Sequence, residues 1–321
     1  MHTNVRLTRS RAKPDVILEL LYRYLMASRN GAIRSPLSTG LRACIGLRTE
    51  LVFENGFRIT LRAHQRPLFR GLISLTYPYG VTFAQDEGKA TGSNWRINLE
   101  TGVLVLPNGI RMTLDSIYEP GILAETFLND VHFRGADFSG LSVIDVGASI
   151  GDTALYFASL GAIVYAYEPD PLNFESLLRN VSLNPQLQRK IVPVNAAVGI
   201  DGQVTLHAGL GSSSGLYGKG GNELTVPSLS LRSILERNHL AEAYLLKVDA
   251  KGAEFEILSQ PEIAHFHLIS LEYSPYLRPG HTVAELLAVL TAQGFVVKRK
   301  FRHNDSFFRL EEHGMIHAER A

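Results

Sequence analysis

From Leu141 onwards, short apolar runs alternate with longer segments whose apolar positions recur every three or four residues. The short runs predict buried strands near 143–147, 163–167, 191–195, 244–249 and 268–272. The periodic segments predict helices near 151–160, 171–183, 229–238, 252–259 and 282–293. Such alternation predicts a sheet covered by helices on both faces. At the end of the chain, "FVVKRK" (295–300) and "SFFRL" (306–310) predict an antiparallel pair of strands.

A different pattern precedes residue 141. Two Asn-Gly pairs, at positions 55–56 and 108–109, each separate segments in which apolar and polar residues alternate, and Asn-Gly favours tight hairpin turns. We therefore expect antiparallel strands and loops from about 45 to 115, followed by a helical lead-in at "DSIYEPGILAETFLND". The chain then has three predicted parts: an N-terminal helix with antiparallel strands of unknown role (1–90), a hairpin with a helical lead-in (91–140), and the alternating domain (141–321).

The segment "VILELLYRYLM" predicts an amphipathic helix. Asp15, Glu19 and Arg23 fall four residues apart on one face, and the apolar positions lie mostly opposite: Ile17, Leu20, Leu21 and Tyr24. We expect this helix to dock through its apolar face, with binding to a membrane surface or a partner as the alternative. Its charges are unlike those of a signal peptide, and no stretch is long enough to span a bilayer. Whether the chain forms a homo-oligomer stays an open question at this point.

The amino-acid composition limits the class of protein and the partners that this chain can have. The 321 residues are 45% hydrophobic and 20% charged, enough for a full core. A formal net charge of +1 gives no global field that would attract nucleic acid or an anionic membrane, and no DNA partner is expected. Cys44 is the single cysteine, which excludes an intrachain disulfide and a Cys-based zinc site and fits a reducing, cytoplasmic compartment.

The stretch "VIDVGASIGD" joins a strand to a helix through glycines, an arrangement that turns the N–H groups of a helix N-terminus towards a ligand. Gly147 and Gly151 are present, but Ser149 replaces the middle glycine of the dinucleotide pattern G-x-G-x-x-G, which disfavours NAD. Glu168 follows about twenty residues after the turn, the spacing of an acid that accepts hydrogen bonds from ribose hydroxyls. Asp145 lies inside the strand end.

Acids recur at other strand ends. Asp249 ends the fourth strand and Glu272 the fifth, so that with Glu168 three acids are expected along one sheet edge. A row of carboxylates favours a cationic ligand, and S-adenosylmethionine carries a sulfonium and an ammonium. Glu254 either caps its helix or faces the same cleft. Two of these acids could hold a divalent ion, but without an Asp-x-Asp or His-rich ligand set we predict no metal.

Four stretches are similar to one known family: "VIDVGASIGDTALYFASLGAIVYAYEPDP", "VPVNAAVG", "LLKVDAKGAEFEIL" and "ISLEYSPY" resemble the FkbM family of S-adenosylmethionine-dependent methyltransferases. The resemblance spans roughly 140 to 300. It implies a Rossmann-like class I methyltransferase sheet with an antiparallel last strand, S-adenosylmethionine as cofactor, and an enzyme of class EC 2.1.1. The family's usual motif is D-x-E-G-A-E, and this chain has Lys251 in place of the first glutamate, which changes the charge that an acceptor meets.

The resemblance also implies roles for individual positions. The methionine end of the cofactor would be shaped by Asp145, Gly147, Ala148 and Gly151. The ribose would be held by Glu168, with Pro169 and Asp170 beside it. The adenine would lie beside Asn195, Ala196, Ala197 and Val198. Asp249 would flank the sulfonium, and Glu254 and Glu272 would face the acceptor.

The family favours O-methylation of a hydroxyl on a sugar, glycan or other natural product. A carboxylate such as Asp249 or Glu254, its pKa raised by burial and by neighbouring acids, is the expected general base. Base N-methylation is disfavoured, because "DAKGAE" lacks the Asn/Asp-Pro-Pro-aromatic element of enzymes that methylate amino groups of nucleic acids. Two alternatives stay open: an RNA (tRNA) methyltransferase that uses the N-terminal segment as a binding module, and a cofactor-binding scaffold without catalysis.

Overall fold

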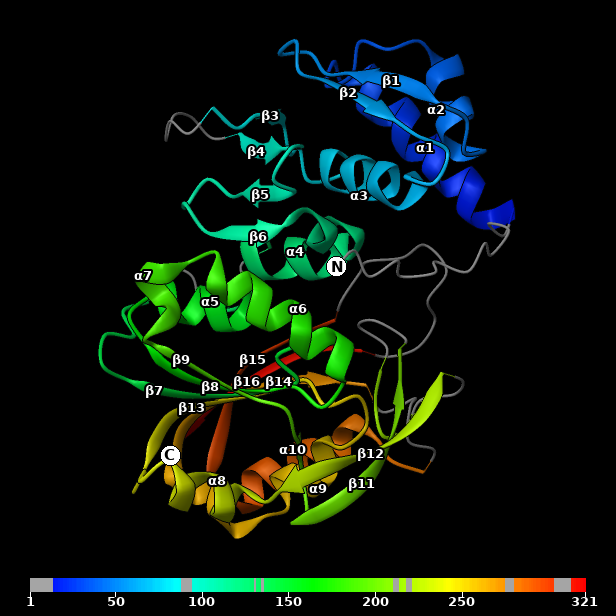
Figure 1. Cartoon of the computed structure of the whole chain (residues 1–321). Helices are drawn as coiled ribbons and strands as arrows, with labels where there is room; N and C mark the ends of the chain where they lie inside the picture. The colour runs from blue at the N-terminus through cyan, green and yellow to red at the C-terminus, as the bar shows by residue number, and fades with distance from the viewer. Residues whose placement is uncertain are drawn as a thin grey trace. The chain divides into compact units, whose positions relative to one another are not determined.

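The computed structural model describes residues 14–87, 94–129, 131–133, 136–209, 214–217, 221–274, 280–302 and 313–321. The chain divides into two compact units, Met1–Gly109 (unit 1) and Ile110–Ala321 (unit 2), whose elements are labelled in Figure 1. The finer division at residues 90 and 140 stays a prediction. Among the residues described, no helix is both long and apolar enough to cross a membrane.

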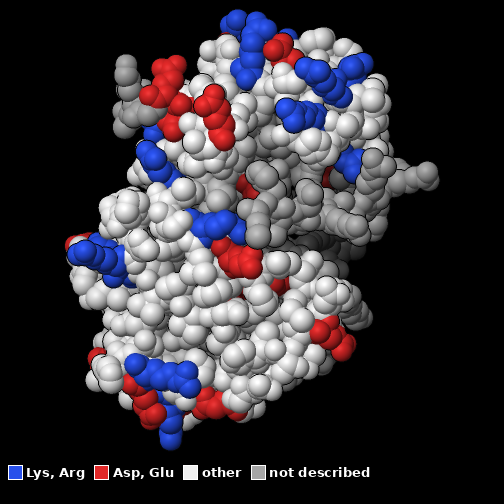
Figure 2. All heavy atoms as spheres, viewed as in Figure 1, with Lys and Arg blue, Asp and Glu red and all other residues white. Residues whose placement is uncertain are grey.

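Charge is distributed unevenly between the two units. Unit 1 holds 15 Lys and Arg against 7 Asp and Glu, whereas unit 2 holds 17 against 24, so the formal net charges are +8 and −7. Figure 2 shows several Lys and Arg side chains on the part of unit 1 where Figure 1 places α1 and α2. The near-zero net charge of the whole chain therefore conceals a basic unit. The inference that no field attracts nucleic acid or an anionic membrane does not hold for unit 1.

The described residues of unit 1 form three helices and five strands. The helices are α1 (Pro14–Arg29), α2 (Leu37–Cys44) and α3 (Arg66–Thr76). The strands are β1 (Thr49–Val52), β2 (Arg58–Leu61), β3 (Phe83–Gln85), β4 (Trp95–Asn98) and β5 (Val103–Val105). The predicted hairpin at Asn55-Gly56 is confirmed, because β1 and β2 pair antiparallel around it. The expectation of antiparallel strands throughout is wrong for β3, which runs parallel to β4.

The predicted amphipathic helix is confirmed as α1, and its buried positions are Leu20, Tyr24 and Ala27. It packs on α2 and α3. The closest approach is at Gly40 of α2, where a Cβ atom would lie 2.6 Å from the Tyr24 ring. A residue without a side chain is therefore required where these two helices meet.

The helix α3 lies in the region from about 45 to 115 that was interpreted as strands and loops, and α2 lies just before it, where no element was predicted. The signal for α3 was present, because Leu68, Leu72 and Leu75 recur at a helical spacing after Pro67, which lies in the first turn, and all three are buried. The neighbouring hairpin pattern drew the interpretation towards strands.

Unit 2 begins with the predicted lead-in, formed by β6 (Arg111–Thr113), the 3₁₀ helix η1 (Leu114–Tyr118) and α4 (Pro120–Phe127). The main sheet then contains seven strands: β7 (Ser142–Val146), β8 (Ile163–Tyr167), β9 (Ile191–Val194), β13 (Ala243–Val248), β14 (Phe266–Tyr273), β15 (Phe295–Arg302) and β16 (Gly314–Arg320). Between them lie α5 (Asp152–Ser159), α6 (Pro171–Ser182), α7 (Pro185–Gln188), α8 (Leu231–Arg237), α9 (Glu254–Leu258), η3 (Pro261–His265) and α10 (Val283–Ala292).

The strand order is β15-β16-β14-β13-β7-β8-β9, in which β16 is antiparallel to both of its neighbours and the remaining adjacent pairs are parallel. The predicted Rossmann-like class I methyltransferase sheet is thus confirmed. The chain leaves β7 towards β8 on one side and later returns through β13 on the other. The carboxyl ends of β7 and β13 therefore flank the switch point at which open α/β sheets bind their ligands.

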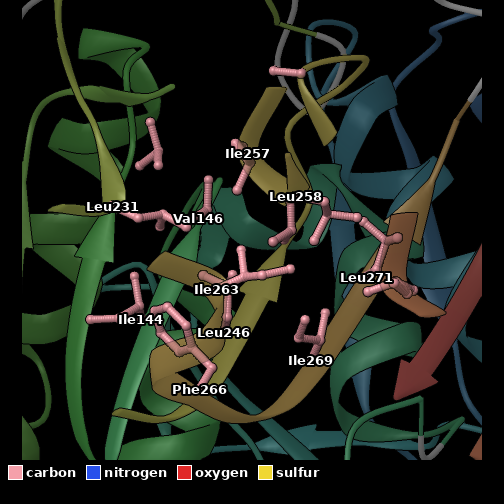
Figure 3. Packing of buried hydrophobic residues seen from close by; sticks show 14 of the residues in the cluster. Ile144, Val146, Leu231, Leu246, Ile257, Leu258, Ile263, Phe266, Ile269 and Leu271 are labelled. Carbon is pink, nitrogen blue, oxygen red and sulfur yellow. The ribbon is translucent and has the colours of Figure 1, made fainter. Parts of the chain in front are cut away.

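Helices cover both faces of this sheet, with α5, α6 and α7 on one face and α8, α9 and α10 on the other (Figure 1). The second face carries a large apolar cluster. Figure 3 shows Ile144, Leu246 and Ile269 of three neighbouring strands packed against the residues of α9 and η3. This fully buried layer keeps the strands in register, so the positions of the residues that follow each strand are set by packing.

Two features of the unit 2 sheets differ from expectation. Between β9 and α8 in the sequence, the chain forms a small additional sheet. Its strands are β10 (Ala197–Val198), β11 (Gly202–Ala208) and β12 (Asn222–Leu229), in the order β10-β12-β11. The partner of β15 is β16 at the C-terminus. The segment 306–310, which was predicted to pair with β15, lies outside the described residues.

Candidate functional site

The ends of β7 and β13 touch each other at the switch point. The backbone N–H of Asp249 donates to the Val146 carbonyl over 3.0 Å. The next residue after β7, Gly147, has a φ of +74°, and a Cβ atom there would lie 2.0 Å from the Asp249 carbonyl oxygen. Only glycine is compatible with this crossing, which explains the first glycine of the turn.

A buried ion pair lies directly beneath the turn. Asp145 of β7 and Lys247 of β13 are register partners, and their carboxylate and ammonium are 3.0 Å apart with both side chains at most 5% exposed. Asp145 also accepts from the Thr153 hydroxyl over 2.6 Å, and Lys247 donates to the Gly147 carbonyl over 2.9 Å. Burial lowers the pKa of Lys247, but the acids around it outweigh burial and raise it.

This pair changes the role expected for Asp145. Its carboxylate is fully buried and neutralised, so it holds the turn in place from below. Sequence reasoning missed Lys247 because it interpreted the fourth strand as uniformly apolar. A lysine inside such a strand, matched by an aspartate in another, was the available signal.

The turn continues through Ala148 and Ser149 to Gly151, the N-cap of α5. Ser149 has a φ of +47° and Gly151 a φ of +85°, so the chain bends sharply before the helix begins. A Cβ atom at Gly151 would lie 3.0 Å from Leu177 of α6. Asp152, which sequence reasoning did not single out, accepts from Thr126, and burial raises the pKa of Asp152 to about 7.

Glu168, at the end of β8, meets the glycine turn as predicted. One carboxylate oxygen accepts from the Ser149 N–H over 2.8 Å, and the other accepts from the Asp170 N–H over 2.9 Å. The residue is 4% exposed, and burial raises the pKa of Glu168 to about 7 despite these two donors. Asn195, predicted to lie beside the adenine, donates to the carbonyls of Glu168 and Pro169, so these residues form one cluster. The two following residues, Ala196 and Ala197, are buried.

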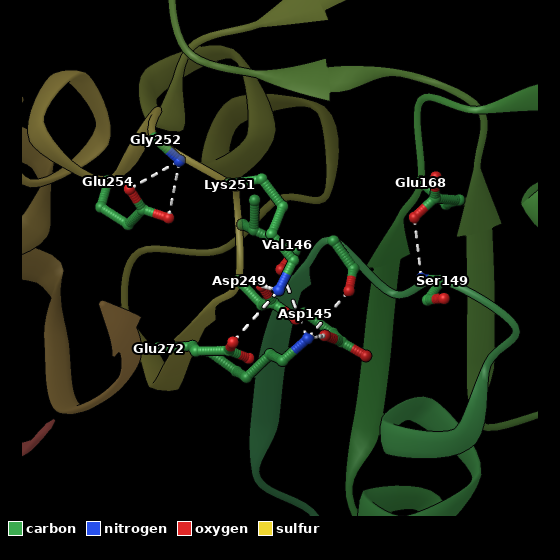
Figure 4. A network of polar contacts seen from close by, with 11 residues as sticks. Asp145, Val146, Ser149, Glu168, Asp249, Lys251, Gly252, Glu254 and Glu272 are labelled. Carbon is green, nitrogen blue, oxygen red and sulfur yellow. Dashed lines mark hydrogen bonds and ion pairs between the residues drawn. The ribbon is translucent and has the colours of Figure 1, made fainter. Parts of the chain in front are cut away.

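Asp249 and Glu272 come together across Lys251 (Figure 4). The Lys251 ammonium is 2.8 Å from Asp249 Oδ1 and 3.1 Å from Glu272 Oε1. The exposed fraction of the side chain is 22% for Lys251, 23% for Asp249 and 14% for Glu272. Lys251 has a φ of +47°, a left-handed conformation that a residue other than glycine rarely adopts.

The two acids differ in proton affinity. Burial alone would raise the pKa of Asp249, but the ammonium groups of Lys251 and Lys247 outweigh it and lower the pKa to about 2. Burial and repulsion from Asp249 raise the pKa of Glu272, in spite of Lys251. The expectation of a raised pKa for Asp249 is therefore wrong. Acids are present at this edge as expected, but Lys251 and Lys247 neutralise part of their charge.

Glu254 is turned into its own loop. Both carboxylate oxygens accept from the Gly252 N–H, over 3.0 and 2.8 Å, and the residue is 1% exposed. Burial raises the pKa of Glu254 to about 7. These contacts correspond to the capping alternative, in which the acid stabilises the start of α9.

Residues 214–217, between β11 and β12, lie over two strand ends. The Ser214 hydroxyl donates to Asp170 over 2.6 Å, near the end of β8. A Cβ atom at Gly215 would lie 2.9 Å from Lys251 Cβ, and Tyr217 packs on Gly252 beyond the end of β13.

Among the described residues, no group of three or more His, Cys, Asp or Glu is placed to hold a metal ion. The candidate site consists of a glycine turn without room for side chains, an acid with two backbone donors and a partly buried acid-lysine cluster.

Comparison with known proteins places these residues in a family. Residues 145–297 match the family model for the methyltransferase FkbM domain. A structure of methyltransferase FkbM from Methylobacillus flagellatus KT is 14% identical, with a TM-score of 0.42, covering 63% of this chain and 54% of that one.

Two further solved structures are similar at comparable levels. Magnesium protoporphyrin IX methyltransferase from Synechocystis PCC 6803 is 15% identical, with a TM-score of 0.36, covering 57% of this chain and 72% of that one. Aeropyrum pernix fibrillarin is 17% identical, with a TM-score of 0.36, covering 61% and 71%. No curated protein matches the sequence. Residues 145–297 of this chain thus match a methyltransferase FkbM domain.

Proposed function

We propose that this protein transfers a methyl group from S-adenosylmethionine to a hydroxyl of a sugar, glycan or other natural product. One observation carries the proposal: an FkbM domain whose glycine turn and Glu168 meet at the switch point of the sheet. When bound, S-adenosylmethionine supplies a methyl group activated by a positive sulfonium. The chain's own residues have to bind the cofactor, orient the acceptor hydroxyl and accept its proton.

The residues fit such a cofactor. Gly147 leaves no side chain above the β7–β13 crossing, and α5 presents its N-terminus at the same turn. Each oxygen of Glu168 accepts a backbone N–H, and the carboxylate lies beside the glycine turn, where it can also accept from ribose hydroxyls. Asn195 holds the Glu168 backbone in place through its carbonyl. These contacts support the roles proposed for Gly147, Gly151, Glu168 and Asn195.

The charge of Asp249 suits the cationic end of the cofactor. With a pKa lowered to about 2, its carboxylate stays ionised near neutral pH, and 23% of its side chain is exposed. The same ionisation makes it a weak proton acceptor, since a base works best with a pKa near the working pH. Asp249 is thus assigned to electrostatic positioning.

Glu272 is assigned as the acceptor of the hydroxyl proton. Its pKa is raised, its side chain is 14% exposed, and it lies at the end of β14 beside the cluster. Lys251 holds the Glu272 carboxylate at 3.1 Å and fixes its orientation. The cofactor would supply the methyl group and keep the electron pair of the broken carbon–sulfur bond. Glu272 would take the proton that the hydroxyl loses, and the ammonium of Lys251 would keep the cluster compact.

The experiment that tests the proposal is calorimetric titration with S-adenosylmethionine and S-adenosylhomocysteine. We expect micromolar affinity for both, and loss of binding in Glu168→Ala. Glu175→Ala is the matched control, because Glu175 lies on α6 with a side chain that is 65% exposed, and the same charge is removed. Binding should survive in the control. Absence of binding by either compound to the folded wild-type protein would refute the proposal.

A further inference from the structure

Unit 1 exposes large aliphatic side chains within one short segment, residues 37–48. Four of them are about half exposed: Leu37 (53%), Leu41 (48%), Ile45 (54%) and Leu47 (45%). The first three are spaced four apart along and just beyond α2, so they lie on the helix face opposite its buried residues Thr39 and Ala43. Together with Arg42 and Arg48, these four side chains are called the α2 face.

The two arginines belong to the same surface. Arg42 and Arg48 are both exposed, and the Arg42 guanidinium donates to the Arg48 carbonyl over 3.0 Å. The Leu47 N–H donates to the Arg42 carbonyl over 2.8 Å, and Gly46 has a φ of +77°. The chain therefore folds back at the end of α2 and keeps Leu47 and Arg48 beside the helix.

The surroundings of the α2 face are basic and partly apolar. Unit 1 has a formal net charge of +8. Among its described arginines, Arg34 and Arg58 form exposed ion pairs, whereas Arg29, Arg62 and Arg70 are exposed at positions where the structure gives no carboxylate partner. The adjacent helix α1 also exposes an apolar stripe, consisting of Leu18, Tyr22 and Leu25.

We propose that the α2 face docks on an anionic lipid bilayer. Its aliphatic side chains would enter the boundary between headgroups and acyl chains, and Arg42 and Arg48 would contact lipid phosphates. Exposed leucines and isoleucines next to arginines on a helix are the composition of interfacial helices. A nucleic acid would satisfy the arginines but leave the aliphatic side chains in water, since such sites rely on aromatic stacking and polar contacts.

The test is flotation of the full chain with vesicles of phosphatidylcholine alone or with one phosphatidylglycerol in three lipids. We expect binding to the anionic vesicles at least tenfold tighter than to the neutral ones, weakened by salt. Leu41→Ser with Ile45→Ser should reduce the affinity at least tenfold, and Arg42→Gln with Arg48→Gln should remove the preference for anionic lipid. The matched control is Leu172→Ser with Ile200→Ser, two residues of unit 2 that are 61% and 74% exposed.

Three results would overturn the proposal. The first is vesicle binding that Leu41→Ser with Ile45→Ser leaves unchanged. The second is tight binding of an RNA homopolymer by a protein that does not float with vesicles. The third is a dimer in sedimentation that the same variant dissociates, again without vesicle binding. Fluorescence of Trp95, buried in unit 1, verifies that each unit 1 variant is folded.

Discussion

At the scale of single residues, the candidate site is governed by charges that are buried or half-buried at strand ends. Glu168 illustrates the consequence, because burial raises its pKa to about 7 while two backbone donors favour the ionised form. A raised carboxyl pKa means that the folded state holds the proton over a pH range in which the unfolded state has lost it. The contribution of Glu168 to stability is therefore present below its ordinary pKa and lost as pH rises through 7.

We predict that affinity for S-adenosylmethionine increases as pH rises through 7, because only the ionised Glu168 accepts from both ribose hydroxyls. Glu168→Gln should weaken binding and flatten this pH dependence. Asp152 and Glu254 have similarly raised pKa values, so the difference between wild type and variant isolates Glu168. Calorimetric titrations of both proteins from pH 6 to pH 8 measure this difference in affinity. An identical slope in the variant would assign the effect to another group.

A second residue-scale prediction concerns the buried pair. Lys247→Met leaves Asp145 buried without its cation, and breaking a buried pair on one side costs about 3–5 kcal/mol. We expect the free energy of unfolding in urea to fall by that amount. Asp145→Asn combined with Lys247→Met removes both charges and should recover most of the loss. If the double variant were as unstable as the single one, packing would be responsible, and the charge argument would fail.

At the scale of elements, contacts between neighbouring helices and strands depend on residues that leave space. We predict that Gly40→Ala destabilises unit 1 by about 1–3 kcal/mol, because the new Cβ atom would lie 2.6 Å from the Tyr24 ring and the helices would have to separate. Gly121→Ala is the matched control. It lies in α4 with nothing within 4 Å of the added atom, and alanine is the better helix residue.

Chemical denaturation followed by Trp95 fluorescence measures the effect of Gly40→Ala, since the single tryptophan lies in unit 1 and is 2% exposed. Far-ultraviolet circular dichroism serves for the control. Equal stability of Gly40→Ala and wild type would show that α1 and α2 can separate without cost.

At the scale of the whole molecule, two compact units of opposite net charge share one chain. The candidate site lies in unit 2, and the α2 face in unit 1. We predict that S-adenosylhomocysteine raises the thermal transition seen by circular dichroism and leaves the Trp95 fluorescence transition of unit 1 within about 1 °C, because a ligand stabilises only the unit that binds it. Parallel shifts of both transitions would instead indicate that the units unfold as one.

The sequence by itself determined the local elements of unit 2 and the kind of site. Strand and helix periodicity is a property of neighbouring residues, so the five predicted parallel strands and their helices appear where expected. The glycine turn and Glu168 could also be identified from the sequence, because a fixed spacing along the chain brings them to adjacent strand ends. In unit 1, the same reasoning found α1 and the β1–β2 hairpin but missed α2, for which no element was predicted, and α3, whose helical spacing was outweighed by the neighbouring hairpin pattern.

Only the tertiary structure decided which charges meet. Lys247 and Asp145 are 102 positions apart and pair because β13 lies beside β7 in register. Lys251 reaches both Asp249 and Glu272 because β14 follows β13 in the sheet, and this contact reverses the pKa expected for Asp249. The pairing of β15 with β16 likewise depends on a strand from the end of the chain. Strand order and register are long-range properties that hydrophobic periodicity does not encode, and they set the electrostatics of the site.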